Sequence, residues 1–114
     1  MAKTEDLTPE TRRGEVWWAD LADDKIRPVL ILTRDPLGRI LHSVMCAPLT
    51  TRDRALASQV RLGPEHGLPN ACVAKLVNVM LVARSQFVER ISSLDTSTMD
   101  SVCEALAYAT GCRS

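Results

Sequence analysis

Six short apolar stretches, separated by polar or Gly- and Pro-containing segments, constrain the fold of this chain more than any other feature. Stretches of this length with partial alternation are typical of β-strands. The clearest helical spacing comes after them, over residues 95–111. Short strands followed by one helix predict a mainly β, α+β domain built on a small, strongly bent sheet or barrel. The expected strands cover residues 15–21, 26–33, 40–49, 56–62, 72–82 (with a bend) and 87–92.

The C-terminal helix carries its own start and stop signals. Asp95 followed by Thr96 offers an N-cap, and Gly111 suits the left-handed position that commonly ends a helix. Apolar residues at helical spacing between them predict one buried stripe, formed by Met99, Val102, Cys103, Leu106 and Ala109.

A chain of 114 residues is long enough for one domain with a modest core. Residues 1–13 are polar and contain Pro9, so we expect a flexible leader there and the folded domain over residues 14–114. No apolar stretch approaches the roughly 20 residues that cross a membrane. The N-terminus also lacks the basic-then-apolar layout of a secretory signal, so we expect a cytoplasmic protein.

The net charge of zero hides a segregation along the chain. Residues 1–24 contain three basic and seven acidic side chains, whereas residues 25–61 contain seven basic and two acidic ones. The basic block is mostly arginine, whose planar fork suits phosphate. A solvated face without a binding role is the alternative interpretation of this block.

Two apolar stretches place a polar side chain where the run begins or ends. Arg27 comes directly before Pro28, and a residue before proline is held extended. Thr50 follows the run that ends at Leu49. If the two strands pair, a guanidinium and a hydroxyl converge at one edge of the sheet, where they can hold a phosphate. Taken alone, each residue is more often an ordinary solvated Arg or a β-forming Thr.

An arginine–hydroxyl site suits a phosphodiester, and RNA brings its own nucleophile, the 2′-hydroxyl. The protein then has to align that oxygen, stabilise the charge that develops on the phosphate and help the 5′-oxygen leave. Arg27 would supply several N–H donors and Thr50 one hydroxyl donor. Because a guanidinium stays charged at neutral pH, we rank its electrostatic role above proton transfer.

Other catalytic and metal-binding patterns are absent from the sequence. It contains no G-x-S-x-G, Walker or H-E-x-x-H motif. Its four cysteines lack the close spacing of zinc ligands, so we expect neither a metal nor a cofactor. Cys46, Cys72 and Cys103 lie in apolar runs and are expected to be buried, whereas Cys112 is expected to be exposed.

From Arg13 to about Cys112, the chain resembles the MazF/PemK family of toxin endoribonucleases. The likeness rests on several motifs in the family's order, including residues 13–21 (RGEVWWADL), 27–35 (RPVLILTRD) and 47–51 (APLTT). The Arg52–Leu56 stretch and the SQV at 58–60 also resemble the shorter actinobacterial members.

The resemblance implies an SH3-like small barrel of the MazF/CcdB type with a C-terminal helix, working as a homodimer. It implies metal-independent, sequence-specific cleavage of single-stranded RNA that leaves 2′,3′-cyclic phosphate and 5′-hydroxyl ends. It further implies inhibition by a cognate MazE-type antitoxin. The catalytic arginine and threonine of the family fall on Arg27 and Thr50.

Two segments depart from the family pattern. The link over residues 22–25 is much shorter than the usual loop that covers the active site. The strand at 73–78 offers Lys75, Val77 and Asn78 where related members tend to carry an Asn and an Asp. The altered strand keeps open a catalytically altered module that binds RNA or antitoxin on the same fold. A CcdB-like gyrase poison is a second alternative, because CcdB toxins resemble MazF in fold.

Trp17 and Trp18 are expected on opposite faces of the first strand, where packing is the default role and base stacking the alternative. The candidate RNA-binding residues are those near the catalytic pair, in the basic block or in the altered strand: Trp18, Lys25, Thr51, Arg52, Arg54, Lys75 and Asn78.

Overall fold

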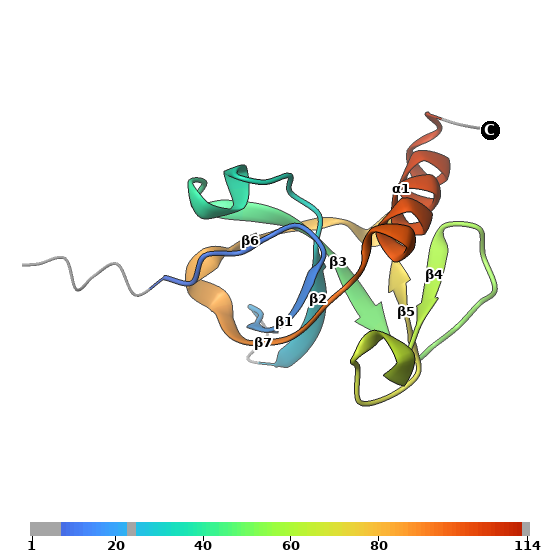
Figure 1. Ribbon diagram of the computed structural model, residues 1–114, viewed down its shortest axis with the longest axis horizontal. Helices are drawn as coiled ribbons and strands as arrows, with labels where there is room; N and C mark the ends of the chain where they lie inside the picture. The colour runs from blue at the N-terminus through green and yellow to red at the C-terminus, as the bar shows by residue number, and fades with distance from the viewer. Residues whose placement is uncertain (1–7, 23–24, 113–114) are drawn as a thin grey trace, which may run out of the picture.

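The structure, a computed structural model, describes residues 8–22 and 25–112, which form seven strands followed by one α-helix (Figure 1). Residues 1–7 of the expected leader and residues 23–24 of the expected turn lie outside the described residues. The predicted 72–82 stretch forms two strands separated by a 3-10 turn, which is the bend that the sequence indicates. The strands and the helix are β1 (Glu15–Asp20), β2 (Ile26–Ile31), β3 (Ser43–Thr50), β4 (Gln59–Leu62), β5 (Cys72–Lys75), β6 (Met80–Ala83), β7 (Phe87–Ser93) and α1 (Thr96–Thr110). The 3-10 turns are η2 (Leu37–Arg39), η3 (Pro64–His66), η4 (Leu76–Asn78) and η5 (Arg84–Gln86).

The strands form one antiparallel, strongly bent sheet. Its order is β4-β5-β3-β2-β1-β7, and β6 pairs with β3 outside this path. Along one edge, β3 pairs with β6 over Ser43 to Cys46 and then with β5 at Leu49 and Thr50. The prediction of a mainly β fold with a C-terminal helix is confirmed. The sheet does not close into a barrel, because the outer strands β4 and β7 do not pair with each other among the described residues.

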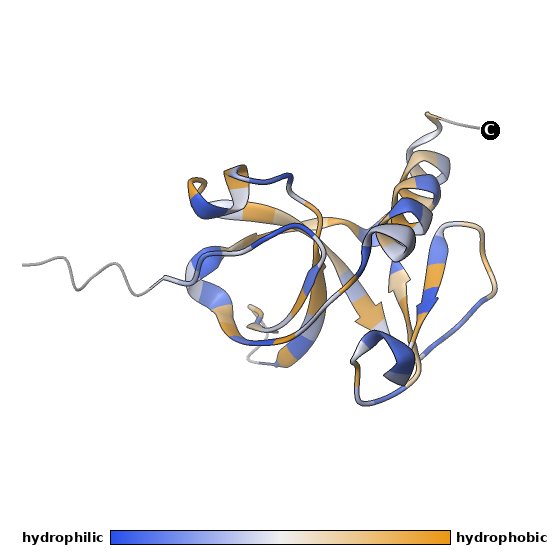
Figure 2. Ribbon diagram, in the orientation of Figure 1, coloured by the Kyte–Doolittle hydropathy of each residue, from blue (hydrophilic) through white to orange (hydrophobic). Residues whose placement is uncertain are grey.

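The paired middle parts of the central strands β2 and β3 are mostly buried on both faces. Leu30 and Ala47 belong to one apolar cluster, whereas Val29 and Cys46 belong to a second cluster. The first cluster includes residues of α1, and the second lies within the bend formed by β1, β6 and β7. Burial on both sides explains the nearly unbroken apolar run of β2, which lacks a polar face. In Figure 2 the hydrophobic colours run through the strands, whereas the η3 loop is mostly hydrophilic.

Helix α1 begins and ends where the sequence predicts. The carboxylate of Asp95 accepts a hydrogen bond of 2.8 Å from the Thr98 backbone, which satisfies one of the free N–H groups at the helix start. Gly111 adopts φ +79° directly after the last turn. Met99 and Val102 are buried as expected, but Cys103 is exposed and Ala105 is buried in its place. No helix among the described residues is long and apolar enough to cross a membrane.

Residues 8–13 run along the domain near η2 and η5. The Thr11 side chain is fully buried, and its hydroxyl donates a 2.8 Å hydrogen bond to the carbonyl of Gly38. A Cβ at Gly38 would lie 2.5 Å from the Thr11 carbonyl oxygen, so this close approach requires glycine. The Arg84 guanidinium donates to the carbonyl of Pro9 at 3.2 Å. These contacts hold the segment before β1 against the domain.

Candidate functional site

Arg27 and Thr50 come from neighbouring antiparallel strands. The β2–β3 register pairs Val29 with Pro48 and Leu30 with Ala47. Continued by two residues, the same register places Arg27 opposite Thr50. Arg27 also keeps an unshifted register with β1, so its side chain leaves the strand on the same face as Val29. The sequence therefore brings the guanidinium and the hydroxyl to one face of the sheet.

Thr50 lies where β3 leaves its pairing with β2 and pairs with β5. Its hydroxyl oxygen accepts a 3.2 Å hydrogen bond from the backbone N–H of Arg52. Because this oxygen is already an acceptor for the chain, its hydrogen is left to donate to a ligand. The local turn therefore prepares Thr50 as a hydrogen-bond donor.

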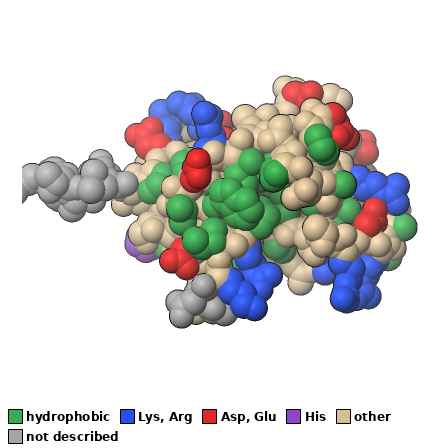
Figure 3. Space-filling view, turned by 90° about the horizontal axis from the view of Figure 1, so that it is seen from below, with side chains coloured by type: hydrophobic (Ala, Val, Ile, Leu, Met, Phe, Trp, Pro, Cys, Tyr) green, Lys and Arg blue, Asp and Glu red, His purple; other side chains and the backbone are tan. Residues whose placement is uncertain are grey.

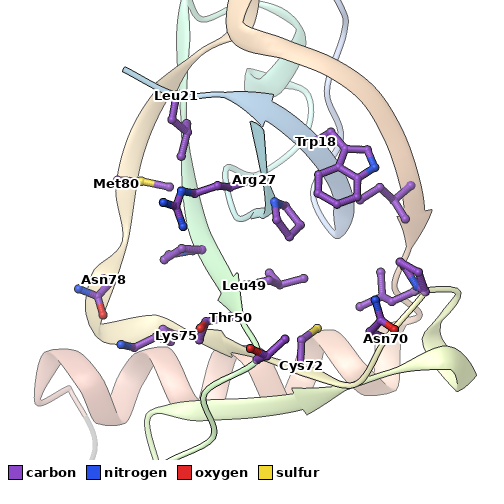
Figure 4. Close-up of a pocket in the computed structure, with 16 residues that line it drawn as sticks. Trp18, Leu21, Arg27, Leu49, Thr50, Asn70, Cys72, Lys75, Asn78 and Met80 are labelled. Carbon is purple, nitrogen blue, oxygen red and sulfur yellow. The ribbon is translucent and has the colours of Figure 1, made fainter. Parts of the chain in front are cut away.

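Both residues line a pocket of about 670 Å³, shown in Figure 4. The Arg27, Lys75 and Asn78 side chains lie toward one side of the cavity, and Trp18 and Asn70 lie on the other side. The residues that line the pocket are Trp18, Leu21, Arg27, Pro28, Pro48, Leu49, Thr50, Thr51, Leu68, Pro69, Asn70, Cys72, Lys75, Asn78, Met80 and Ile91.

The lining contains two basic side chains, Arg27 and Lys75, and no acidic one among the described residues. The pocket can therefore attract an anion without carboxylate repulsion. Figure 3 shows the side of the molecule seen from below in Figure 1, where hydrophobic side chains gather near the middle and Lys and Arg side chains lie beside them.

Six of the nine residues predicted for the site line this pocket, and three do not. The six are Trp18, Arg27, Thr50, Thr51, Lys75 and Asn78, and the other three are Lys25, Arg52 and Arg54. All three are exposed. Arg52 directly follows the pocket residue Thr51, whereas the backbone of Arg54 is tied to the Gln59 side chain at 3.0 Å.

The basic block is partly neutralised within the 51–61 segment. The Arg61 guanidinium pairs with the Asp53 carboxylate at 2.5 Å. The hydrogen bond from the Ala55 backbone, followed by that from Arg61, lowers the pKa of Asp53 below its ordinary value. Arg61 therefore contributes less net positive charge than its place in the sequence indicates, and Arg52 and Arg54 remain as exposed cations beyond the pocket.

Residues that sequence reasoning missed line the side of the pocket that contains Trp18. Asn70 and Cys72 come from the loop after η3 and from β5, and Ile91 comes from β7. The breakers in residues 63–70 indicate only a surface loop. That this loop returns beside β1 and β7 depends on the bend of the sheet, for which the sequence carries no local signal.

The cysteines differ in burial and in chemistry. Burial raises the pKa of the Cys46 thiol to about 12 and also raises the pKa of Cys72, which is half-buried in the pocket. A raised pKa keeps a thiol protonated and weakly nucleophilic at neutral pH. Among the described residues, no three His, Cys, Asp or Glu side chains are grouped so that they could hold a metal ion.

The two tryptophans of β1 separate as predicted. Trp17 packs edge-on against Phe87, with ring centroids 5.7 Å apart, and its indole N–H donates to Glu15 at 2.9 Å. Trp18 instead lines the pocket and is half-buried.

Residues 12–110 match the family described as PemK-like, MazF-like toxin of type II toxin-antitoxin system. The chain is 36% identical over 102 residues to the probable endoribonuclease MazF2 of Mycobacterium tuberculosis strain H37Rv, covering 89% of this chain and 99% of that protein.

Two solved structures are also similar to this chain. The Mycobacterium tuberculosis toxin MazF-mt6 matches with a TM-score of 0.79 and 33% identity, covering 85% of this chain and 96% of that one. A mycobacterial endoribonuclease in complex with its cognate antitoxin matches with a TM-score of 0.80 and 25% identity, covering 91% and 98% of the two chains.

Proposed function

The chain belongs to the family of PemK-like, MazF-like toxins of type II toxin–antitoxin systems, and from this premise we propose that it is an endoribonuclease that cuts single-stranded RNA. The proposal names 2′,3′-cyclic phosphate and 5′-hydroxyl ends as products. The observation that carries it is that Arg27 and Thr50, from neighbouring strands, line one pocket whose described lining is basic and contains no acidic residue.

In the proposed reaction, the 2′-oxygen of the substrate attacks the adjacent phosphorus and the bond to the 5′-oxygen breaks. The 2′-hydroxyl proton passes to water, and the departing 5′-oxygen takes up a proton from water. Arg27 donates N–H groups to the phosphate oxygens as negative charge grows on them, and Thr50 donates its hydroxyl hydrogen. Lys75 adds positive charge to the same pocket. These donors are our reason for proposing a reaction that needs no metal ion.

The remaining predicted RNA-binding residues keep supporting roles in this proposal. Thr51 and Asn78 offer hydrogen bonds within the pocket, and Trp18 offers an aromatic surface. The exposed cations Lys25, Arg52 and Arg54 contact RNA phosphates outside the pocket, where their contribution depends on salt.

We further propose that a MazE-type antitoxin inhibits the chain by occupying this pocket. An acidic and apolar segment would complement the Arg27 and Lys75 charges and the apolar lining. The mycobacterial endoribonuclease compared above is seen in complex with its cognate antitoxin, which supports such a partner. We also propose that the chain works as a homodimer in the cytoplasm, where its RNA substrate is found. Light scattering of the purified protein tests the dimer.

The experiment that tests the activity is incubation of the purified protein with a long single-stranded transcript in EDTA, followed by mapping of the fragment ends. Discrete cuts that disappear in Arg27→Ala and in Thr50→Val support the proposal. Arg61→Ala is the matched control, because Arg61 pairs with Asp53 outside the pocket. Intact RNA that stays bound to the protein would favour the catalytically altered module. In a separate incubation with gyrase and DNA, a trapped gyrase–DNA complex would favour the gyrase poison. The endoribonuclease names of the relatives make both alternatives less well supported.

A further inference from the structure

We propose that the end of the pocket opposite Arg27 holds a nucleobase of the RNA, with Trp18 as its stacking surface and Asn70 as the residue that selects the base. This inference rests on the proposed ribonuclease function and concerns the sequence of the substrate.

The two ends of the pocket differ in charge. Arg27 and Lys75 supply both basic side chains at one end (Figure 4). Trp18 and Asn70 lie on the other side (Figure 4), and neither carries a charge. A nucleotide has the same division, because its phosphate is charged while its base is neutral, flat and apolar on both faces.

Trp18 is suited to hold the flat face of a base. It lines the pocket and is half-buried, whereas its neighbour Trp17, on the opposite face of β1, packs against Phe87. Stacking on aromatic side chains is a common way in which proteins hold unpaired bases, and it tolerates every base. The indole therefore supplies affinity and leaves the choice of base to a polar neighbour.

Asn70 supplies that choice. Its side chain is exposed at the pocket rim, and no hydrogen bond joins its carboxamide to another described residue. A carboxamide presents a donor and an acceptor side by side. The Watson–Crick edge of each base also has a donor beside an acceptor, in an order that differs between adenine or cytosine and guanine or uracil. The orientation in which the carboxamide faces the base therefore sets which bases it accepts beside the cleaved phosphate.

The loop that carries Asn70 is fixed to the rest of the domain. The Ser92 hydroxyl of β7 donates a hydrogen bond to the carbonyl of His66, and the Nδ1 atom of His66 accepts a 3.1 Å hydrogen bond from the backbone of Gly63. Leu68 is buried, with 5% of its surface exposed. These contacts hold the segment just before Asn70, so the backbone that carries its carboxamide has a defined place relative to the pocket, as a specificity-determining residue needs.

The test uses a library of single-stranded RNA with randomised sequence, cut by the wild type and by two matched variants. The wild type is expected to prefer a particular base at one fixed position beside the cut. In Asn70→Asp, two acceptors replace the donor–acceptor pair, so cutting beside guanine, which presents two donors at N1 and N2, should rise roughly tenfold or more relative to the other bases. Asn78→Asp makes the same chemical change at the phosphate end, where the added negative charge should slow cleavage without changing the preferred base.

A second measurement reads binding without cleavage. In a Thr50→Ala background, a short RNA with the preferred sequence should quench tryptophan fluorescence, and the additional Trp18→Phe change should remove most of the quenching and weaken binding. An unchanged cutting motif in Asn70→Asp, or undiminished quenching in Trp18→Phe, would overturn the base subsite while leaving the ribonuclease function standing. RNA left intact by the wild type would overturn the proposed function instead, and the absence of quenching would then overturn the subsite as well.

Discussion

Arg27 at the start of β2 and Thr50 at the end of β3 line the same pocket, and the β2–β3 register sets them opposite each other when it is extended by two residues. The antiparallel pairing of these two strands, whose central residues are buried on both faces, brings the two positions together. A site built in this way is set by strand register, so its geometry does not depend on a mobile loop.

The register yields a first prediction about the two side chains. Arg27→Lys keeps the charge but loses the fork of N–H donors, and Thr50→Ser keeps the hydroxyl. We expect Thr50→Ser to retain most cleavage, whereas Arg27→Ala and Thr50→Val each lose on the order of 100-fold or more in single-turnover rate, as removal of one donor to a developing anion usually costs. Arg27→Lys should fall between these limits. Equal rates for Thr50→Ser and Thr50→Val would contradict a donor role for the hydroxyl.

The second prediction concerns the exposed arginines beyond the pocket. Arg52→Ala and Arg54→Ala should each weaken RNA binding in a catalytically inactive background. Each should also flatten the dependence of log affinity on log salt by roughly 0.7 for every phosphate that the arginine neutralises in the wild type. Arg61→Ala should change the slope less, because Asp53 already compensates that charge. A salt titration by fluorescence anisotropy gives all three slopes. Identical slopes for the wild type and for Arg52→Ala would remove Arg52 from the RNA path.

A third prediction concerns stability at alkaline pH. Burial raises the pKa of Cys46 from 9.0 to about 12, so the folded state holds the thiol proton more tightly than the unfolded state does. The resulting stabilisation is fully present below pH 9.0 and is lost as the pH rises from there toward about 12. The free energy of unfolding from urea titrations should therefore fall more steeply above pH 9.0 in the wild type than in Cys46→Val, which has no group to titrate at this position. Parallel curves would show that Cys46 is not buried in solution.

A fourth prediction follows from the backbone at Gly67. This residue has φ +83°, and a Cβ there would lie 2.6 Å from the Ser92 hydroxyl oxygen. Gly67→Ala should therefore disturb the hydrogen bond between Ser92 and His66 and lower stability by about 1 kcal/mol or more. Because the loop leads to Asn70, the variant should also relax the base preference more than it lowers total cleavage. Ser92→Ala removes the same hydrogen bond without backbone strain and is the control. An unchanged cutting motif in both variants would separate the loop from base selection.

Local sequence signals predict the elements well and their long-range arrangement less well. The caps at Asp95 and Gly111 are short-range chemistry, and both are confirmed. The sequence places Cys103 on the buried stripe because apolar spacing alone cannot locate the centre of the face that α1 turns to the sheet. The buried set includes Ala105 instead, and the Cys103 sulfur accepts a hydrogen bond from Arg13.

The residues of the candidate site differ in the same way: some of their positions can be predicted from the sequence, and others cannot. Arg27 and Thr50 can be paired from the sequence because strands that follow each other tend to pair, and antiparallel pairing brings the start of the first strand beside the end of the second. The position of Asn70 in the site cannot be predicted from the sequence, because it depends on how far the sheet bends and on where the 63–70 loop meets β7. For a related reason, the sequence does not decide between a bent sheet and a closed barrel. Closure depends on strand stagger, which short apolar runs do not encode, and in the structure the described strands form a sheet that is not closed.

The double-sided packing of β2 and β3 makes the helix a distant support of the chemistry. Val102 of α1 lies in the same apolar cluster as Leu30. Leu30 belongs to β2, the strand that also carries Arg27. A void opened beneath α1 would let β2 shift toward it and draw the guanidinium away from its partner hydroxyl. Substitutions that weaken the packing of this helix should therefore lower the cleavage rate before they measurably lower the fraction of folded protein.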